Sequence, residues 1–158
     1  MDIYTYIKKD HRKVAGLMDQ VVASRDPSER RTLFATIRDE LLLHLSSEEQ
    51  TFYKAIEDAS RAQAVEEQMD HAHEEHDEVR EYLRKLERLD VNEEAWIETF
   101  GEFKHAVAHH VEEEEGQVWK KARKYLSDDR AVELAREMDA VKKQEKKEMA
   151  SRVMETAH

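Results

Sequence analysis

The chain has 158 residues and a net charge of −11, with 3 glycines, 1 proline and no cysteine. Its length fits one domain, since domains usually have roughly 100–200 residues. So few turn-forming residues exclude sandwiches, barrels and doubly wound sheets, which need many more turns. The lack of cysteine excludes disulfides, iron–sulfur clusters, zinc–thiolate sites, thiol nucleophiles and covalently attached c-type haem.

The charge balance and the hydropathy pattern restrict the partners and the location. A general nucleic-acid binder needs a basic face to neutralise phosphates, so with this acidic excess we expect no nucleic-acid partner. No run approaches the ~18 apolar residues of a membrane span. The first residues have neither the basic nor the apolar part of a secretory signal. We therefore expect a cytoplasmic protein with no membrane partner.

Apolar residues recur at helical spacing along nearly the whole chain and predict five helical segments. The spacing also argues against disorder, the competing interpretation for a chain with 40% charged residues. The expected segments, in order, run from about Tyr4 to Ser24, from Pro27 (capped by Asp26) to Asp58, from a cap at Ser60 to Leu89-Asp90, from a cap at Asn92 to Tyr125, and onward from a cap at Ser127-Asp128.

The lengths of these segments predict how they pack. Helices of roughly 20–30 residues joined by short links lie antiparallel to their neighbours. We therefore predict an all-α fold in which residues 1–126 form an up-down-up-down four-helix bundle. Residues 127–158 are expected to add a C-terminal helical extension with a charged tail.

Ionisable residues interrupt the apolar stripe of each of the four bundle helices, on the face that should be buried. The first and third helices each place a histidine there. The second and fourth each place a histidine and a glutamate spaced i, i+4, so that the two lie one above the other. These residues are His11, His44, Glu48, His76, His110 and Glu114.

A bound metal is the simplest way to compensate such a set. Each buried ionisable group without partners costs several kcal/mol, and six would exceed the ~5–15 kcal/mol that stabilises a whole domain. Imidazole nitrogens with carboxylate oxygens suit iron, manganese, zinc or copper. Two carboxylates can bridge two ions ~3.5–4 Å apart, and so many ligands are too many for one tetrahedral zinc.

The pattern of ionisable residues on the four successive helices resembles that of the hemerythrin HHE cation-binding family. In chain order the pattern is a lone histidine, an H-x-x-x-E pair, a lone or paired histidine and a second H-x-x-x-E pair. The resemblance extends from about Ile3 to Leu126. The segments that carry it are Lys9-Asp10-His11-Arg12, His44-Leu45-Ser46-Ser47-Glu48-Glu49 with Phe52-Tyr53, Glu75-His76-Asp77-Glu78-Val79, and His109-His110-Val111-Glu112-Glu113-Glu114-Glu115-Gly116.

The resemblance implies a non-haem di-iron centre, with no haem, inside a four-helix bundle. The implied ligands are His11 and His44 for one iron, His76 and His110 with His73 as a further candidate for the other, and Glu48 and Glu114 as bridges.

Two features differ from the oxygen-carrying hemerythrins. Those proteins have H-x-x-x-H on the third helix, whereas His73 and His76 are three residues apart, about 60° around the helix. Their last helix ends in H-x-x-x-x-D, whereas this chain has His110-x-x-x-Glu114. The differences favour the broader HHE group, whose roles include iron handling, oxygen or nitric oxide sensing and peroxide chemistry.

Less specific interpretations remain open for the same residues. Each i, i+4 pair could be a structural, hydrogen-bonded histidine–glutamate pair, and the chain could be a haem bundle or an interaction module. His71, His105 and His109 lie on polar faces and are expected to contact solvent. A one-residue shift in helical register would exchange His109 for His110.

The functional prediction is a metal-binding protein that binds or senses oxygen, nitric oxide or peroxide at an open iron position. The alternatives are an enzyme that acts on peroxide or nitric oxide and an iron storage or handling protein. No residue beyond the ligand set stands out as a general acid or base. The sequence does not indicate an oligomeric state.

Overall fold

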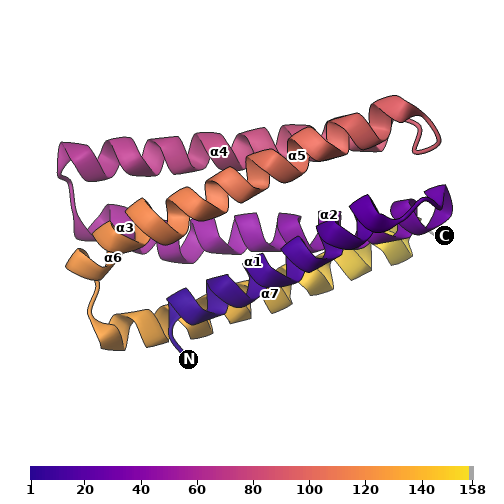
Figure 1. Ribbon diagram of the computed structural model, residues 1–158. Helices are drawn as coiled ribbons and strands as arrows, with labels where there is room; N and C mark the ends of the chain where they lie inside the picture. Colours follow the sequence, from indigo (N-terminus) through magenta and orange to yellow (C-terminus); the bar gives the residue numbers. More distant parts are fainter. Residues whose placement is uncertain (157–158) are drawn as a thin grey trace.

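The computed structural model describes residues 1–156, and every element within them is helical (Figure 1). Two single π-helical turns join pairs of α-helices without a break, so the described chain forms five helical rods. The predicted all-α fold with five helical segments is confirmed. In chain order the elements are α1 (Ile3–Ala23), α2 (Pro27–Glu48), η1 (Glu49–Tyr53), α3 (Lys54–Ala59), α4 (Gln63–Arg88), α5 (Glu94–Glu113), η2 (Glu114–Val118), α6 (Trp119–Tyr125) and α7 (Asp128–Thr156).

The helix caps agree with the sequence at two positions and differ at two. Asp26 caps α2 by accepting from the Ser28 amide at 3.0 Å, and Ser127 accepts from the Arg130 amide at 3.1 Å. The prediction that Ser60 caps α4 was wrong, because Ser60 ends α3. The prediction that Asn92 caps α5 was also wrong. The carboxylate of Asp90 binds both nitrogens of Asn92, which places Asn92 in the turn before the helix.

Two apolar clusters occupy the two ends of the bundle, and their order along each helix gives the chain direction. The helices α1 and α4 run from the first cluster to the second. The rods α2–η1–α3 and α5–η2–α6 run the opposite way, which is the predicted up-down-up-down arrangement. One residue of each cluster marks the direction of each rod. With the residue of the first cluster named first, these pairs are Ile7 and Val14 in α1, Phe52 and Leu41 in α2–η1, Ala72 and Val79 in α4, and Val118 and Val107 in α5–η2.

The fifth rod, α7, lies alongside α1 and α2 and covers that side of the bundle (Figure 1). Leu134 and Met138 are fully buried in the first cluster. Further along α7, the carboxylate of Glu145 accepts from the Ser46 hydroxyl at 2.8 Å. The boundary between a bundle and an extension at residues 126 and 127 stays a prediction, and residues 157–158 lie outside the described chain. No helix within residues 1–156 combines the length and apolar character needed to cross a bilayer.

Candidate metal centre

A layer of ionisable side chains separates the two apolar clusters in the middle of the bundle. Each of the four bundle rods contributes at least one residue to this layer. On both sides of that position, the buried stripe of the rod is apolar. Glu48, His76 and Glu114 are fully buried. His11, the least buried member, has a side chain that is only 8% exposed. The six members are His11, His44, Glu48, His76, His110 and Glu114.

These side chains form two groups that share both carboxylates. The first group adds His11 and His44 to Glu48 and Glu114, and the second adds His76 and His110 to the same two glutamates. Within each group the candidate ligand atoms all lie within 4.8 Å of one another. Two ions with two shared carboxylates would need this arrangement.

Each of the two shared carboxylates lies close to the Nε2 atom of one histidine from each group. Glu48 lies 3.4 Å from His44 Nε2 and 3.0 Å from His76 Nε2. Glu114 lies 3.6 Å from His11 Nε2 and 3.1 Å from His110 Nε2.

Several of these inward-facing atoms have no hydrogen-bond partner of acceptable geometry. They are buried, and an unpaired buried polar atom costs about 1–3 kcal/mol. Cations between them would remove that cost, so the residues fit a metal centre. The atoms are the Nε2 of His11 and of His44, both carboxylate oxygens of Glu48, and Oε1 of Glu114.

The opposite ring nitrogen of all four histidines is held by a carboxylate. Histidines that bind metals usually donate their other N–H to a carboxylate, a backbone carbonyl or water, which fixes the tautomer and orients the ring. Here that donation would leave every Nε2 lone pair directed at the centre. The Nδ1 contacts are His11 with Glu115 at 2.9 Å, His44 with Asp10 at 2.8 Å, His76 with Glu49 at 2.7 Å and His110 with Glu75 at 3.0 Å.

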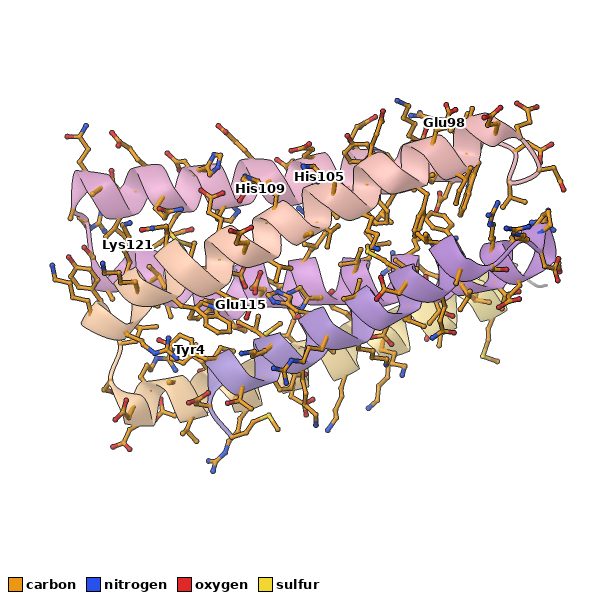
Figure 2. All side chains as sticks on the ribbon, viewed as in Figure 1. Tyr4, Glu98, His105, His109, Glu115 and Lys121 are labelled. Atoms are coloured by element: carbon orange, nitrogen blue, oxygen red, sulfur yellow. The ribbon has the colours of Figure 1, made fainter. Side chains whose placement is uncertain are left out.

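The supporting carboxylates follow a two-fold pattern in the sequence. Asp10 and Glu75 each directly precede a histidine of the centre but support a histidine on the following rod. Glu49 and Glu115 each directly follow a shared glutamate and support a histidine of another rod. Figure 2 labels Glu115 between α5 and α1, where it reaches His11. The helical spacing alone predicts no role for these four residues, although each is adjacent to a predicted ligand.

The π-helical turns η1 and η2 begin immediately after Glu48 and at Glu114. In an α-helix a residue five positions on is rotated by roughly 140° to another face, whereas a π-helical turn bonds i to i+5 and keeps it on the same face. Tyr53, five residues after Glu48, therefore points to the centre. Its hydroxyl donates to Glu114 Oε2 at 2.5 Å and lies 3.0 Å from His76 Nε2.

The electrostatics couple the histidines to the glutamates. Burial lowers the pKa of His44, but Glu48 and Asp10 outweigh it and raise the pKa to about 10. Burial likewise opposes protonation of His110, while Glu114 and Glu75 raise its pKa to about 10. Burial raises the pKa of Glu48, and the histidines overcome it and hold that pKa well below its ordinary value. Without cations, protonated His44 and His110 thus form ion pairs with Glu48 and Glu114.

The other four histidines within residues 1–156 lie apart from the buried layer. The side chain of His73, which was a ligand candidate, is 39% exposed and lies 2.8 Å from Glu57 rather than at the centre. His71 and His109 are 47% and 65% exposed, and His105 is also exposed. Six of the seven candidate ligands therefore converge, and the ligand role itself stays a prediction.

The model of the hemerythrin HHE cation binding domain matches residues 2–122 of the chain. The chain belongs to the hemerythrin HHE cation-binding domain family. This HHE domain resembles the crystal structure of a hemerythrin HHE cation binding domain-containing protein from Mycobacterium kansasii, with a TM-score of 0.79 and 25% sequence identity. The match covers 91% of this chain and 86% of the other. The family supports metal binding at the centre described above.

A curated relative of this HHE domain is a protein of Nostoc sp. named DNA nickase. The two are 25% identical over 142 residues, which is 90% of this chain but only 39% of the relative. The HHE domain therefore spans well under half of that protein.

Proposed function

We propose that the protein binds two iron ions as a non-haem di-iron centre and uses an open iron position to bind or sense oxygen, nitric oxide or peroxide in the cytoplasm. His11 and His44 would hold one ion, His76 and His110 the other, and the two buried glutamates would bridge them. The observation that carries the proposal is the orientation of all four imidazoles, with Nδ1 on a carboxylate and Nε2 toward the shared glutamates.

Bound iron would supply reversible coordination and electron transfer for a small oxidising ligand. The protein's own residues set the conditions for that chemistry. The apolar clusters on both sides exclude bulk water from the centre, and the Tyr53 hydroxyl holds a proton against Glu114. The supporting carboxylates orient the histidines.

A groove beside His11 offers a route from the surface. It has a volume of about 460 Å³, lies between α1 and α5–η2, and is lined largely by apolar side chains such as Ala15, Val107, Ala108 and Val111. An apolar groove suits uncharged diatomic molecules and hydrogen peroxide better than charged metabolites.

The decisive test is the metal content and spectrum of the protein purified from iron-replete cells. We expect two irons per chain and a near-ultraviolet absorption band that develops when the anaerobic ferrous protein meets oxygen. His44→Ala/His110→Ala should lose both. His105→Ala, on the outside of α5, is the matched control and should retain both. A colourless wild-type protein without iron would contradict the proposal.

Catalysis at the same centre is the alternative function. Steady oxygen evolution from peroxide that is lost in Glu48→Ala would identify an enzyme, whereas stoichiometric binding without turnover would identify a binding protein or sensor. We expect no action on DNA, because the chain carries a net charge of −11 and phosphate contacts need basic side chains.

A further inference from the structure

Two more H-x-x-x-E pairs lie outside the buried centre, where α4 and α5 run side by side. They have the same i, i+4 spacing as the pairs of the centre, which places each histidine and its glutamate on one face of a helix. Figure 2 labels one of these histidines, His109, on the part of α5 that faces α4. The four residues, which we name the outer cluster, are His71 and Glu75 in α4 and His109 and Glu113 in α5.

The two pairs converge on one point between the helices. The candidate ligand atoms of His71, Glu75 and Glu113 all lie within 4.8 Å of one another. His71 Nε2 is 3.2 Å from Glu113 and 3.6 Å from Glu75. From the other side, His109 Nε2 is 3.6 Å from Glu113 and 3.7 Å from Glu75. Both imidazoles thus present Nε2 to the same two carboxylates.

The charges at this point favour a cation. Glu75 and Glu113 are close enough to repel each other, and among residues 1–156 their ion-pair partners are histidines, with no lysine or arginine. His110 pairs with Oε1 of Glu75. Oε2 of Glu75 and the carboxylate of Glu113 therefore face only the imidazoles of His71 and His109 among the ion-pair partners within residues 1–156.

Glu75 differs from a surface carboxylate in being fixed. Its side chain is only 10% exposed, and Oε1 is held by Nδ1 of His110 at 3.0 Å. The other oxygen, Oε2, is left facing His71 and His109. A preorganised carboxylate loses little freedom when it binds an ion, which strengthens the site.

We propose that the outer cluster binds one divalent first-row transition-metal ion. Imidazole nitrogens combined with carboxylate oxygens are the donors that ions such as Zn²⁺ and Fe²⁺ take in proteins. The ion lies one side chain from the buried centre, because Glu75 contacts both. The outer site shares Glu75 with the support of His110, but none of its four residues belongs to the six-residue layer.

The test is a calorimetric titration of the full-length protein with Zn²⁺, after the protein has been loaded with iron and passed through a desalting column. We expect wild type to bind one more Zn²⁺ per chain than His71→Ala/His109→Ala. Glu113→Gln, which keeps both histidines, should weaken that binding roughly tenfold or more, since even indirect partners of a metal ligand contribute about 10–100-fold. His105→Ala, which removes an exposed histidine nearby, should match wild type.

Equal Zn²⁺ stoichiometry and affinity in wild type and in His71→Ala/His109→Ala would overturn the proposal and leave ordinary histidine–glutamate ion pairs. The substituted histidines are exposed, so thermal unfolding followed by circular dichroism should confirm an unchanged fold. Any Zn²⁺ that enters the buried centre does so in all variants and cancels in the comparison. Failure of the iron proposal would appear instead as absent iron before the titration begins.

Discussion

Asp10 accepts from Nδ1 of His44 at 2.8 Å, and the same carboxylate oxygen contacts the ammonium group of Lys142. The three residues belong to α1, α2 and α7, so the C-terminal helix takes part in orienting a candidate ligand. Lys142 and His44 together hold the pKa of the half-buried Asp10 below its ordinary value, against the effect of burial. Asp10 is therefore a fixed anion that positions the imidazole.

Asp10→Ala is expected to lower iron affinity about 10–100-fold, the usual effect of removing the partner of a metal-binding histidine. Asp10→Asn should have a smaller effect, because its amide oxygen still accepts from Nδ1 but carries no charge. Competition with a chelator of known affinity measures both values. Asp19→Asn, which removes an exposed charge from the same helix, is the control. Equal affinity in Asp10→Ala and wild type would show that Asp10 does not position His44.

Tyr53→Phe tests the hydroxyl that the π-helical turn η1 directs at the centre. The ring remains to fill the core, but Glu114 loses its 2.5 Å donor. The metal-free protein should lose about 1.5–3 kcal/mol of unfolding free energy, the net contribution of a hydrogen bond to a charged group, while His110 Nε2 remains 3.1 Å from the same oxygen. Urea denaturation gives this value, and Tyr125→Phe on α6 provides the comparison. An unchanged unfolding free energy would mean that the hydroxyl adds nothing to the metal-free fold.

The sequence could predict the bundle and most of the centre because one physical rule governs both. Apolar residues at helical spacing identify the buried face, and an ionisable residue within that stripe must then be buried as well. His11 and His76 were found in this way, although neither has a glutamate one turn later in its own helix. The i, i+4 pairs supplied the two glutamates.

The same rule could not find the features that depend on departures from α-helical spacing or on contacts between helices. Tyr53 faces the centre because η1 is π-helical, and a count of 3.6 residues per turn places it elsewhere. Asp10 supports a histidine of another helix, so its role follows from packing. His73 lies outside the layer because it precedes His76 by three positions and is therefore rotated around the helix, where its side chain contacts Glu57.

The metal-free protein should lose stability as the pH rises from about 6.5 to 10. The pKa of His44 and that of His110 are raised from 6.5 to about 10 in the folded chain. Their stabilising effect is therefore complete below pH 6.5 and is lost as the pH approaches 10. Burial raises the pKa of Glu49, but His76 and Arg80 outweigh burial and lower this pKa to about 2. The stabilisation that Glu49 contributes is therefore present above pH 4.5 and is lost as the pH falls toward 2.

Bound metal should remove the alkaline part of this dependence, because metal ligation requires neutral imidazoles. Urea denaturation at several pH values, with and without iron, measures the difference. The metal-free curve should fall between pH 7 and 10, while the iron-loaded curve should stay nearly level there. A metal-free curve that is flat over this range would show that the two histidines are not protonated in the folded protein.

Filling the apolar groove should slow ligand access without disturbing the centre. Ala15 and Ala108 are exposed on facing walls beside His11, so Ala15→Phe and Ala108→Phe place a ring in the groove without entering the apolar core. The rate of nitric oxide binding to the ferrous protein, followed by stopped-flow absorption, should fall severalfold in each variant while the iron content stays at the wild-type value. Ala106→Phe introduces the same ring on the part of α5 that faces α4 and should bind at the wild-type rate. If all three variants bind nitric oxide as fast as wild type, the ligand reaches the centre by a route other than this groove.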